Sequence, residues 1–302
     1  MYYLKYPSLL LALSAFFWAG NIVLARAVHD EIPPFTMVFF RWLIALAFLL
    51  PFVFSEIKAN TTEIKEKWKG LLWLGFTGTV GFNAMMYIGL NYTTANNAVL
   101  INSLVPVFIL VFSFIFMSEK IGFVKVIGCG ISFIGMSVII TSGQLNTLRG
   151  FTLNPGDFWI SAAMMSWAIY TISLKNRPTS LSPLAFLASL LVLGLPILLP
   201  FWLWEISEKG LMEFTTPNAL SLIYFGVFPS LIAYIFWNYG VSQLGASRAG
   251  IFTHLVPVFG ILLSAIFLKE KVHAHHILGA SLIFISIWIL NLTSKGVDSE
   301  PH

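Results

Sequence analysis

Long apolar runs separated by short polar islands form the dominant pattern of this chain. The runs are about 20 residues long, the length that a helix needs to cross the hydrocarbon core of a bilayer. Because lipid offers the backbone no hydrogen-bond partners, each run must satisfy its own peptide groups, and this requirement predicts helices. Proline, glycine and charged residues mark the breaks between them. The ten predicted spans are 8–28, 34–54, 70–91, 95–117, 122–142, 156–175, 183–204, 217–243, 246–268 and 274–293.

Two stretches of the chain repeat one another. The segment NAVLINSLVPVFILVFSFIFMSEKI, from Asn97, aligns with RAGIFTHLVPVFGILLSAIFLKEKV, from Arg248, at a constant offset of 151, and earlier in the chain the offset is 149. Equivalent positions are Pro106 and Pro257, Glu119 and Glu270, Trp18 and Trp167, and Pro34 and Pro183. Two related halves in an apolar chain are typical of a transporter whose binding site lies between the repeats.

The repeat divides the chain into two five-span units. We expect one unit at 1–146, a second at 155–294 and a short cytoplasmic tail at 295–302. Five is an odd number of crossings, so two units with the same internal order insert with opposite orientation. The loops at 118–122 and 269–273 then lie on opposite faces of the membrane. The predicted fold is therefore an all-α integral membrane protein of ten transmembrane helices, arranged as two inverted five-helix repeats.

Composition supports the membrane interpretation. Of 302 residues, 58% are hydrophobic and 10% are charged, with a mean hydropathy of +0.85, whereas soluble domains carry roughly 25% charged residues. A large soluble helical core would need polar helix faces, which these runs lack. The net charge is +4, but no basic, aromatic-interleaved patch indicates a nucleic-acid partner. The single cysteine, Cys129, excludes an internal disulfide and is interpreted as a packing residue.

The placement of Lys and Arg predicts the orientation of the chain in the membrane. If the N-terminus is cytoplasmic, eleven Lys and Arg residues fall on the cytoplasmic side and five on the other, with Arg41 left out as intramembrane. The positive-inside rule therefore favours both termini in the cytoplasm.

Several segments resemble the motifs of one transporter family. LSAFFWAGNIVLAR is similar to the W-G-x-N-F/I-x-x-x-R/K opening of EamA-type drug/metabolite transporters, and PPFTMVFFRWLIALAFLLP is similar to the P-x-x-x-x-x-x-R-F pattern of their second helix. GLNYTTANNAVLINSLVPVFILVFSFIFMSEKI, followed by GCGISFIGMSVII, resembles their A-x-x-A-x-L-I-x-x-L-x-P-x-F signature. The second half repeats it as GASRAGIFTHLVPVFGILLSAIFLKEKV and ILGASLIFISIWIL. The order and duplication of these motifs extend the resemblance over nearly the whole chain.

The resemblance implies a ten-helix carrier of the bacterial inner membrane that works by alternating access. Members of the family export amino acids, other metabolites, nucleobase-like compounds and drugs, and related translocators exchange sugar phosphates or nucleotide sugars. The family therefore does not fix the substrate. The chain departs from the pattern at Ala19, where the family has glycine, and at Leu190, which stands opposite Arg41. The second departure argues against a symmetrical charged site.

Polar and aromatic residues at matching positions of the two halves nominate a substrate site at mid-membrane. Amides supply hydrogen bonds that hydrocarbon lacks, and rings offer stacking and, for an ammonium, cation–π attraction. The alternative is that the Trp and Tyr residues form interfacial belts or pack helices, and that the Asn residues bridge helices. An amide facing lipid is costly, which favours the site for Asn21 and Asn83. The predicted substrate-binding residues are Trp18, Asn21, Asn83, Tyr87, Asn102, Trp167, Tyr170, Tyr234, Trp237, Asn238 and His254.

Two basic side chains, Arg41 and His254, are predicted to lie deep within spans, where a charged group is expensive unless it is paired or hydrated. Arg41 is expected either to attract a carboxylate or phosphate or, as we favour, to play a structural role by snorkelling or by capping neighbouring carbonyls. His254, whose repeat partner is Ser103, either titrates in a proton-linked step or, as we favour, is a neutral histidine bonded across helices. No Asp or Glu falls at the centre of a span, so carboxylate-based proton coupling has no clear carrier.

Pro106 and Pro257 are predicted to interrupt the fourth and ninth spans at equivalent positions. A proline inside a helix removes a hydrogen bond and kinks the helix. Equivalent kinks beside the site suit hinge bending during alternating access, and static kinks that shape the cavity are the alternative.

These observations predict a secondary transporter rather than an enzyme or a receptor. No HExxH motif, GxSxG motif or intramembrane acidic pair indicates a catalytic centre, and the chain has no soluble domain typical of a receptor. His273, His275 and His276 are only loosely spaced, so we expect no metal site, and without a nucleotide-binding loop we expect no direct ATP use and no cofactor.

We expect the substrate to be a small amphipathic metabolite, such as an exported amino acid. Drug efflux and the translocation of a lipid or lipid-linked sugar are the alternatives on the same fold. The expected partners are this solute and the lipid bilayer. A monomer is the expectation, although the sequence leaves the oligomeric state open.

Overall fold

The structure, a computed structural model, is built of helices in the residues that it describes. These are residues 6–28, 30–90, 92–93, 98, 101–119, 122–143, 154–267, 269 and 271–297, without the side chains of Arg26, Tyr87 and 291–297. No strand occurs in this part of the chain, in agreement with the all-α prediction.

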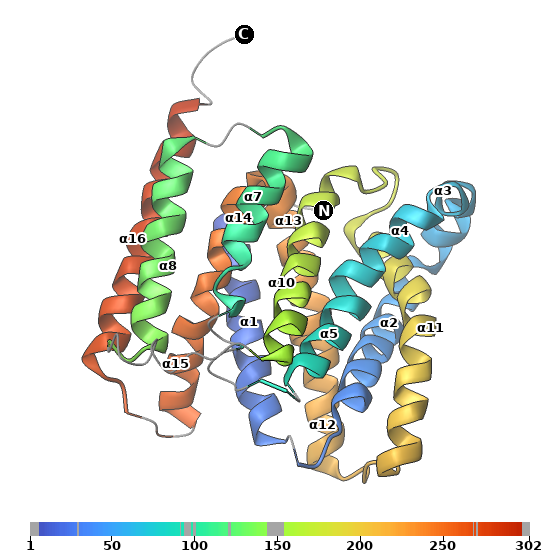
Figure 1. The fold of residues 1–302 in the computed structure, drawn as a ribbon. Helices are drawn as coiled ribbons and strands as arrows, with labels where there is room; N and C mark the ends of the chain where they lie inside the picture. Colours follow the sequence, from blue (N-terminus) through green and yellow to red (C-terminus); the bar gives the residue numbers. More distant parts are fainter. Residues whose placement is uncertain are drawn as a thin grey trace.

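The helices of the two halves follow one another in a similar order (Figure 1). The first half contains α1 (Pro7–Ala27), α2 (Pro34–Ala59), α3 (Thr61–Glu66), α4 (Trp68–Gly75), the π-helical turn η1 (Phe76–Val80), α5 (Gly81–Leu90), α7 (Val105–Met117) and α8 (Phe123–Ile140). The second half contains α10 (Pro155–Ser173), the 3-10 turn η2 (Leu174–Asn176), α11 (Pro183–Lys209), α12 (Thr216–Phe225), the π-helical turn η3 (Gly226–Ile232), α13 (Ala233–Leu244), α14 (Ala246–Ile251), the 3-10 turn η4 (Phe252–His254), α15 (Leu255–Phe267) and α16 (Ala274–Val297).

Each of the ten predicted spans corresponds to one or more of these elements. The stretches long and apolar enough to span a bilayer are Pro7–Ala25, Pro34–Ala59, Trp68–Leu90, Phe123–Ile140, Pro183–Lys209, Thr216–Leu244 and Ala246–Phe267. Two shorter apolar helices, α7 and the Ala274–Leu290 part of α16, lie in the predicted fourth and tenth spans. The predicted sixth span corresponds to α10, in which 11 of 19 residues are buried. Part of the predicted 95–117 span and part of the loop between the halves lie outside the described residues.

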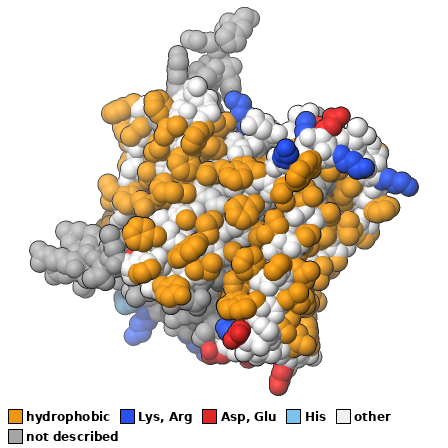
Figure 2. All heavy atoms as spheres, turned by 45° about the vertical axis from the view of Figure 1, so that its right-hand side comes forward, with side chains coloured by type: hydrophobic (Ala, Val, Ile, Leu, Met, Phe, Trp, Pro, Cys, Tyr) orange, Lys and Arg blue, Asp and Glu red, His pale blue; other side chains and the backbone are white. Residues whose placement is uncertain are grey.

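Charged and apolar side chains separate over the surface. Figure 2 shows a face on which hydrophobic side chains cover the middle, whereas Lys, Arg, Asp and Glu lie toward its upper and lower ends. Phe52, Phe76 and Leu203 are among the exposed apolar residues. A bilayer requires this distribution, because only the middle of the protein faces hydrocarbon.

Helix contacts between the halves follow a reciprocal pattern. In the first half, α1 packs against α13 and α15; in the second half, its counterpart α10 packs against α5 and α7. The two second helices, α2 and α11, pack against each other, and so do the two last helices, α8 and α16. Exchanging the two halves therefore reproduces the same set of neighbours. In Figure 1, α7 ends and α8 begins at the upper end of the bundle, whereas α15 ends and α16 begins at the lower end.

A carboxylate at the end of each second helix caps the start of the other. Glu205, near the end of α11, accepts hydrogen bonds from the backbone N–H groups of Phe35 and Thr36 at 3.0 and 2.7 Å and from the Thr36 hydroxyl at 2.9 Å. Glu56, near the end of α2, accepts from the N–H and the hydroxyl of Ser182 at 2.5 and 2.7 Å. The first N–H groups of a helix have no partner within it, and negative charge is favourable there. The α2–α11 pair is thus antiparallel and closed at both ends.

The repeat offset of 149 places Glu56 on Glu205, so the two caps are equivalent positions. The sequence analysis did not select either residue, because both were expected in loops beyond the spans. The repeat nevertheless contained a signal for the caps, because the two acidic residues occupy equivalent positions just beyond the second and seventh predicted spans.

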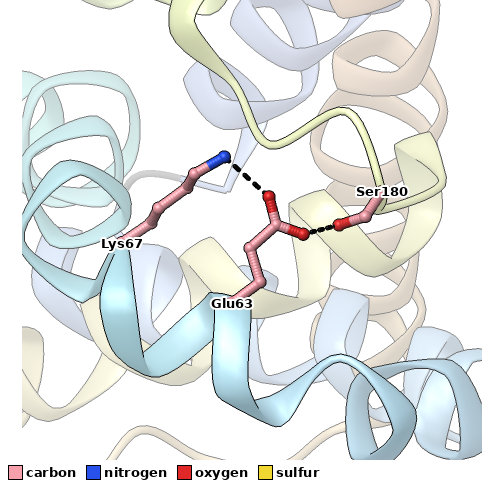
Figure 3. Close-up of polar contacts among 3 residues, drawn as sticks. All are labelled: Glu63, Lys67 and Ser180. Carbon is pink, nitrogen blue, oxygen red and sulfur yellow. Dashed lines mark hydrogen bonds and ion pairs between the residues drawn. The ribbon is translucent and has the colours of Figure 1, made fainter.

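A smaller polar cluster lies beside the Glu56 cap. Glu63, on α3, pairs with Lys67 at 2.6 Å and accepts a hydrogen bond from Ser180, which precedes α11 (Figure 3). The contact links the short helix after α2 to the chain segment between α10 and α11. Because Lys67 is exposed and Glu63 is only half-buried, solvent screens the ion pair, which adds at most about 1 kcal/mol.

The third span of each half contains a π-helical turn at the same place. The turn η1 covers Phe76–Val80 and η3 covers Gly226–Ile232, and at offset 151 Gly78 corresponds to Pro229. A π turn redirects backbone carbonyls away from the regular helix ladder and recurs at functional sites. Here the carbonyl of Thr77 accepts from Ser166 at 2.9 Å, which ties η1 to α10.

Gly78 allows α10 to approach η1 closely. A Cβ atom at this position would lie 2.3–2.6 Å from ring atoms of Tyr170, which is fully buried. Any larger residue would therefore displace the Tyr170 ring.

The prolines predicted to kink the fourth and ninth spans each follow an irregular turn of the chain. Pro106 follows a turn at 103–104, and Pro257 follows the 3-10 turn η4, which lies inside the continuous span Ala246–Phe267. A proline has no N–H to donate to the preceding turn, so a local departure from the regular α-helical hydrogen-bond pattern is expected there. The kink and the hinge role of Pro106 and Pro257 stay predictions.

We predict that Glu205→Gln destabilises the protein more than Glu208→Gln. Glutamine keeps one acceptor oxygen but loses the charge and the second acceptor, leaving donors at the start of α2 unsatisfied, at a cost of about 1–3 kcal/mol. Glu208 is exposed on the same helix and serves as the control. The measurement is the apparent melting temperature of the two variants in detergent, and equal melting temperatures would contradict the cap.

We predict that Gly78→Ala lowers the melting temperature, whereas Gly70→Ala does not. The new methyl group collides with the Tyr170 ring, and overpacking of this kind costs about 1–3 kcal/mol. At Gly70 an added Cβ meets no atom within 4 Å. Indistinguishable thermal unfolding of the two variants would show that α10 and η1 are not held at this distance.

Candidate substrate-binding site

Five aromatic residues predicted for the site converge in the structure. Trp18 of α1 contacts Trp167 of α10 at 5.4 Å between ring centroids, and both contact Tyr234 and Trp237 of α13. Tyr170 lies one turn along α10, 5.3 Å from Trp167 and 6.2 Å from Tyr234. Ring pairs favour centroid separations of about 4.5–7 Å in edge-on or offset geometry. We call these five residues, together with Trp42 and Phe82, the aromatic cluster.

The aromatic cluster lies between the two halves. Trp42 of α2 meets Tyr234 edge-on at 4.9 Å, and Phe82 of α5 contacts Trp167 at 5.4 Å. Rings from α1, α2 and α5 in the first half therefore pack against rings from α10 and α13 in the second. Sequence analysis missed Trp42 and Phe82, although Trp42 follows directly after Arg41 and Phe82 directly precedes Asn83.

The burial of these aromatic residues tests whether they form an interfacial belt. Trp237 and Tyr170 are fully buried, Tyr234 and Trp167 nearly so, and Trp18 is half-buried. An interfacial belt would expose them to lipid headgroups, so that alternative is wrong for Trp167, Tyr170, Tyr234 and Trp237. Their role in binding a substrate stays a prediction.

Hydrogen bonds fix the orientation of the rings. The Tyr170 hydroxyl donates to Oδ1 of Asn238 at 2.8 Å. The Tyr234 hydroxyl donates to the carbonyl of Gly78 at 2.7 Å, and Nε1 of Trp18 donates to the carbonyl of Pro229 at 3.1 Å. Both carbonyls belong to the π turns η1 and η3, so the two irregular turns supply acceptors to rings from the opposite half.

Arg41 is buried and reaches across the halves. Its Nε donates to the Ser230 hydroxyl at 2.6 Å, and Ser230 donates in turn to the carbonyl of Phe225 at 2.7 Å. The guanidinium lies 5.3 Å from the centre of the Trp42 ring, a distance suited to cation–π attraction. With a 6% exposed side chain, Arg41 does not snorkel to the membrane surface. Its hydrogen bond to Ser230 in η3 joins the two halves, as a structural role would require.

His254 contacts its own repeat partner. Nε2 lies 2.9 Å from the backbone carbonyl of Ser103, exactly one repeat offset away, which places both residues where the halves meet. A carbonyl can only accept, so Nε2 carries a proton. The bond joins the two halves, and the neutral state of His254 stays a prediction. Nδ1 is buried without a partner.

The asparagines predicted for the site differ from one another in burial and in hydrogen bonding. Asn83 is buried and donates to the carbonyl of Thr79 in its own helix. Asn21 is half-buried one turn from Trp18, and its Oδ1 has no partner. Asn102, also half-buried, directly precedes Ser103. The side chain of Tyr87 lies outside the described residues.

Three histidines at the start of α16, His273 just before the helix and His275 and His276 in its first turn, pack on one another. Ring centroids of His275 and His276 are 4.2 Å apart, and His273 is 5.5 Å from His275. Among the residues placed by the structure, no group of three His, Cys, Asp or Glu side chains is arranged to hold a metal ion.

Known proteins share both halves of this sequence. The chain matches the EamA-like transporter family twice, at residues 5–141 and 154–292. It is 25% identical over 285 residues to the uncharacterized transporter YyaM of Bacillus subtilis, covering 94% of this chain and 92% of that protein. It is 28% identical over 288 residues to the uncharacterized transporter YetK of the same bacterium, covering 93% and 86%.

A solved crystal structure of a protein 18% identical in sequence superposes with a TM-score of 0.78 over 97% of this chain and 99% of that chain. At this identity the likeness shows the fold alone. The two family matches, by contrast, cover nearly all of the sequence and confirm the resemblance drawn from its motifs, together with the ten-helix membrane architecture. The chain belongs to the EamA-like transporter family.

Proposed function

We propose that this membrane transporter is a secondary carrier that exports a small amphipathic metabolite, such as an amino acid, by alternating access. The observation that carries the proposal is the aromatic cluster, which gathers rings from both halves at their buried interface. Rings accept the apolar part of a solute, and the amide and indole groups at their edges suit its polar part.

We infer that the two halves are inverted repeats, and two features support this. The caps by Glu56 and Glu205 show that α2 and α11, which are equivalent helices, run in opposite directions. The ends of α7 and α15, also equivalent, lie at opposite ends of the bundle (Figure 1). Carriers built in this way expose a site between the repeats first to one side of the membrane and then to the other.

The contacts between the halves suit such a motion. In the aromatic cluster they are ring contacts together with the hydrogen bonds of Tyr234 and Trp18 to carbonyls of the opposite half. A ring of the substrate can replace a ring of the protein with little loss of contact area. At the two ends of the α2–α11 pair they are the charged caps at Glu56 and Glu205, which are directional. We propose that one end opens while the cap at the other end holds.

We further propose a bacterial inner membrane location with both termini in the cytoplasm. The support is the excess of Lys and Arg on the side of the termini, including the Lys-rich stretch around α3 at the upper end of Figure 1. Drug efflux and lipid or lipid-sugar translocation remain the alternative activities, and a flux panel separates them from metabolite export.

We predict that cysteines placed at Gly122 and at Lys271 label from opposite sides of the membrane. Each is introduced singly after Cys129→Ala, which removes the native thiol, and membrane-impermeant maleimide is applied to right-side-out and inverted vesicles. Inverted repeats place the two positions on opposite faces because each half has an odd number of crossings. Labelling of both positions from one side would refute the arrangement.

We predict saturable exchange of at least one amino acid by the purified protein in liposomes. Trp237→Ala and Asn83→Ala should each lower this flux about tenfold or more, because each removes a contact worth over 1.4 kcal/mol. Trp73→Ala is the matched control, since Trp73 is 51% exposed on α4. Absence of flux across the panel would count against amino acid export, and flux of only hydrophobic drugs or of labelled lipids would support the corresponding alternative.

A further inference from the structure

Three hydrogen-bond donors in and beside the aromatic cluster are buried without an acceptor. They are Nε1 of Trp42, Nε1 of Trp237 and Nδ2 of Asn238. All three residues are at most 1% exposed. A buried donor without a partner is destabilising, and native proteins contain few of them. Their concentration around one set of contacting rings therefore points to a ligand that supplies acceptors.

Three protein acceptors around these rings already have a donor. Oδ1 of Asn238 accepts from the Tyr170 hydroxyl, which leaves the NH2 group of this amide without a partner. The Gly78 carbonyl accepts from Tyr234, and the Pro229 carbonyl accepts from Trp18. Oδ1 of Asn21 is an unpartnered acceptor, and the unpartnered Thr171 hydroxyl can donate or accept, so donors are the more numerous of the unpartnered groups.

Positive charge beside the cluster favours an anionic ligand, as the unpartnered donors do. Arg41 lies beside the cluster with its guanidinium 5.3 Å from the centre of the Trp42 ring. The helices α1, α5 and α13 contain no Asp or Glu, α10 contains only Asp157, in its first turn, and α2 contains only Glu56, near its end, where it caps α11. A positive group in surroundings of low dielectric attracts an anion far more strongly than it would in water.

We propose that the aromatic cluster binds the carboxylate of an organic anion with an apolar or aromatic body. The carboxylate oxygens accept from the Trp42 and Trp237 indoles and the Asn238 amide, Arg41 adds electrostatic attraction, and the rings hold the body. A carboxylate has about four acceptor positions and no donor, which matches a surplus of donors. The inference rests on the proposed function in that it takes the cluster as the substrate site.

The cluster offers an ammonium group cation–π contact with ring faces but no carboxylate counter-ion on α1, α5 or α13. Asn21 carries an unpartnered amide oxygen one turn from Trp18, but a neutral oxygen is no counter-ion for a desolvated cation, and Arg41 repels it. The carboxylate is therefore the required group of an amino acid substrate, and the ammonium is dispensable.

The test compares phenylalanine with 3-phenylpropanoate, which lacks the ammonium, and with phenylalaninamide, which lacks the carboxylate. Binding to the purified full-length protein is measured from the rise in apparent melting temperature with ligand concentration. We expect 3-phenylpropanoate to bind at least as tightly as phenylalanine, and phenylalaninamide about tenfold or more weakly. Equal or tighter binding of the amide, or no binding by either carboxylate, would overturn the proposal.

Variants assign the effect to the donors. Trp42→Phe and Trp237→Phe keep an aromatic ring but remove the indole N–H, and each should raise the Kd for 3-phenylpropanoate about tenfold. Trp202→Phe is the matched control, because its Nε1 is also buried and unpartnered but its ring stacks on Phe39 at 4.3 Å, outside the cluster. An unchanged Kd in both cluster variants, or an equal rise in the control, would refute the assignment.

Binding and flux separate this inference from the proposed function. Carboxylate-dependent binding without transport in liposomes would uphold the anion site and contradict the carrier. Transport of phenylalanine together with equal transport of phenylalaninamide would uphold the carrier and contradict the anion site.

Discussion

Polar groups inside this protein have only other protein groups to bond to, and the structure satisfies many of them by reaching from one half of the chain to the other. Glu205 caps α2, Arg41 bonds to Ser230, Tyr234 bonds to Gly78, and His254 bonds to Ser103. Helices in lipid are not driven together by the hydrophobic effect, so packing and bonds of this kind determine how they associate. The interface between the halves is therefore both the structural centre of the molecule and the place where its polar chemistry is concentrated.

The reciprocal arrangement of helices is symmetrical, but the side chains that it brings together are not. Glu56 and Glu205 keep the same residue at equivalent positions, and each performs the same capping role. By contrast, Arg41 and Trp42 correspond to Leu190 and Leu191 at offset 149, and Ser103 corresponds to His254. The caps at the ends of the bundle thus follow the repeat, whereas the interior keeps Trp18 and Trp167 but differs at these other positions. A single solute without two-fold symmetry is better matched by such an interior than by a symmetrical one.

The two π turns connect the backbone to this interior. Both occur in the third span of their half, and both direct carbonyls to rings from the opposite half, Gly78 to Tyr234 and Pro229 to Trp18. The donors of Trp42, Trp237 and Asn238 have no such acceptor. The backbone irregularities thus determine which rings of the cluster are hydrogen-bonded across the halves.

The sequence by itself determined the class of fold, the ten spans and the repeat, because the length of an apolar run and its offset from a similar run depend on the order of residues alone. It also selected Trp18, Trp167, Tyr170, Tyr234 and Trp237, since matching positions in two halves end up near their common interface. Only the tertiary structure decided that Trp42 and Phe82 join them, and that Glu56 and Glu205 are caps. Each of these features depends on which atoms of a distant segment lie within hydrogen-bond or contact distance. Helical periodicity in the sequence does not determine such distances.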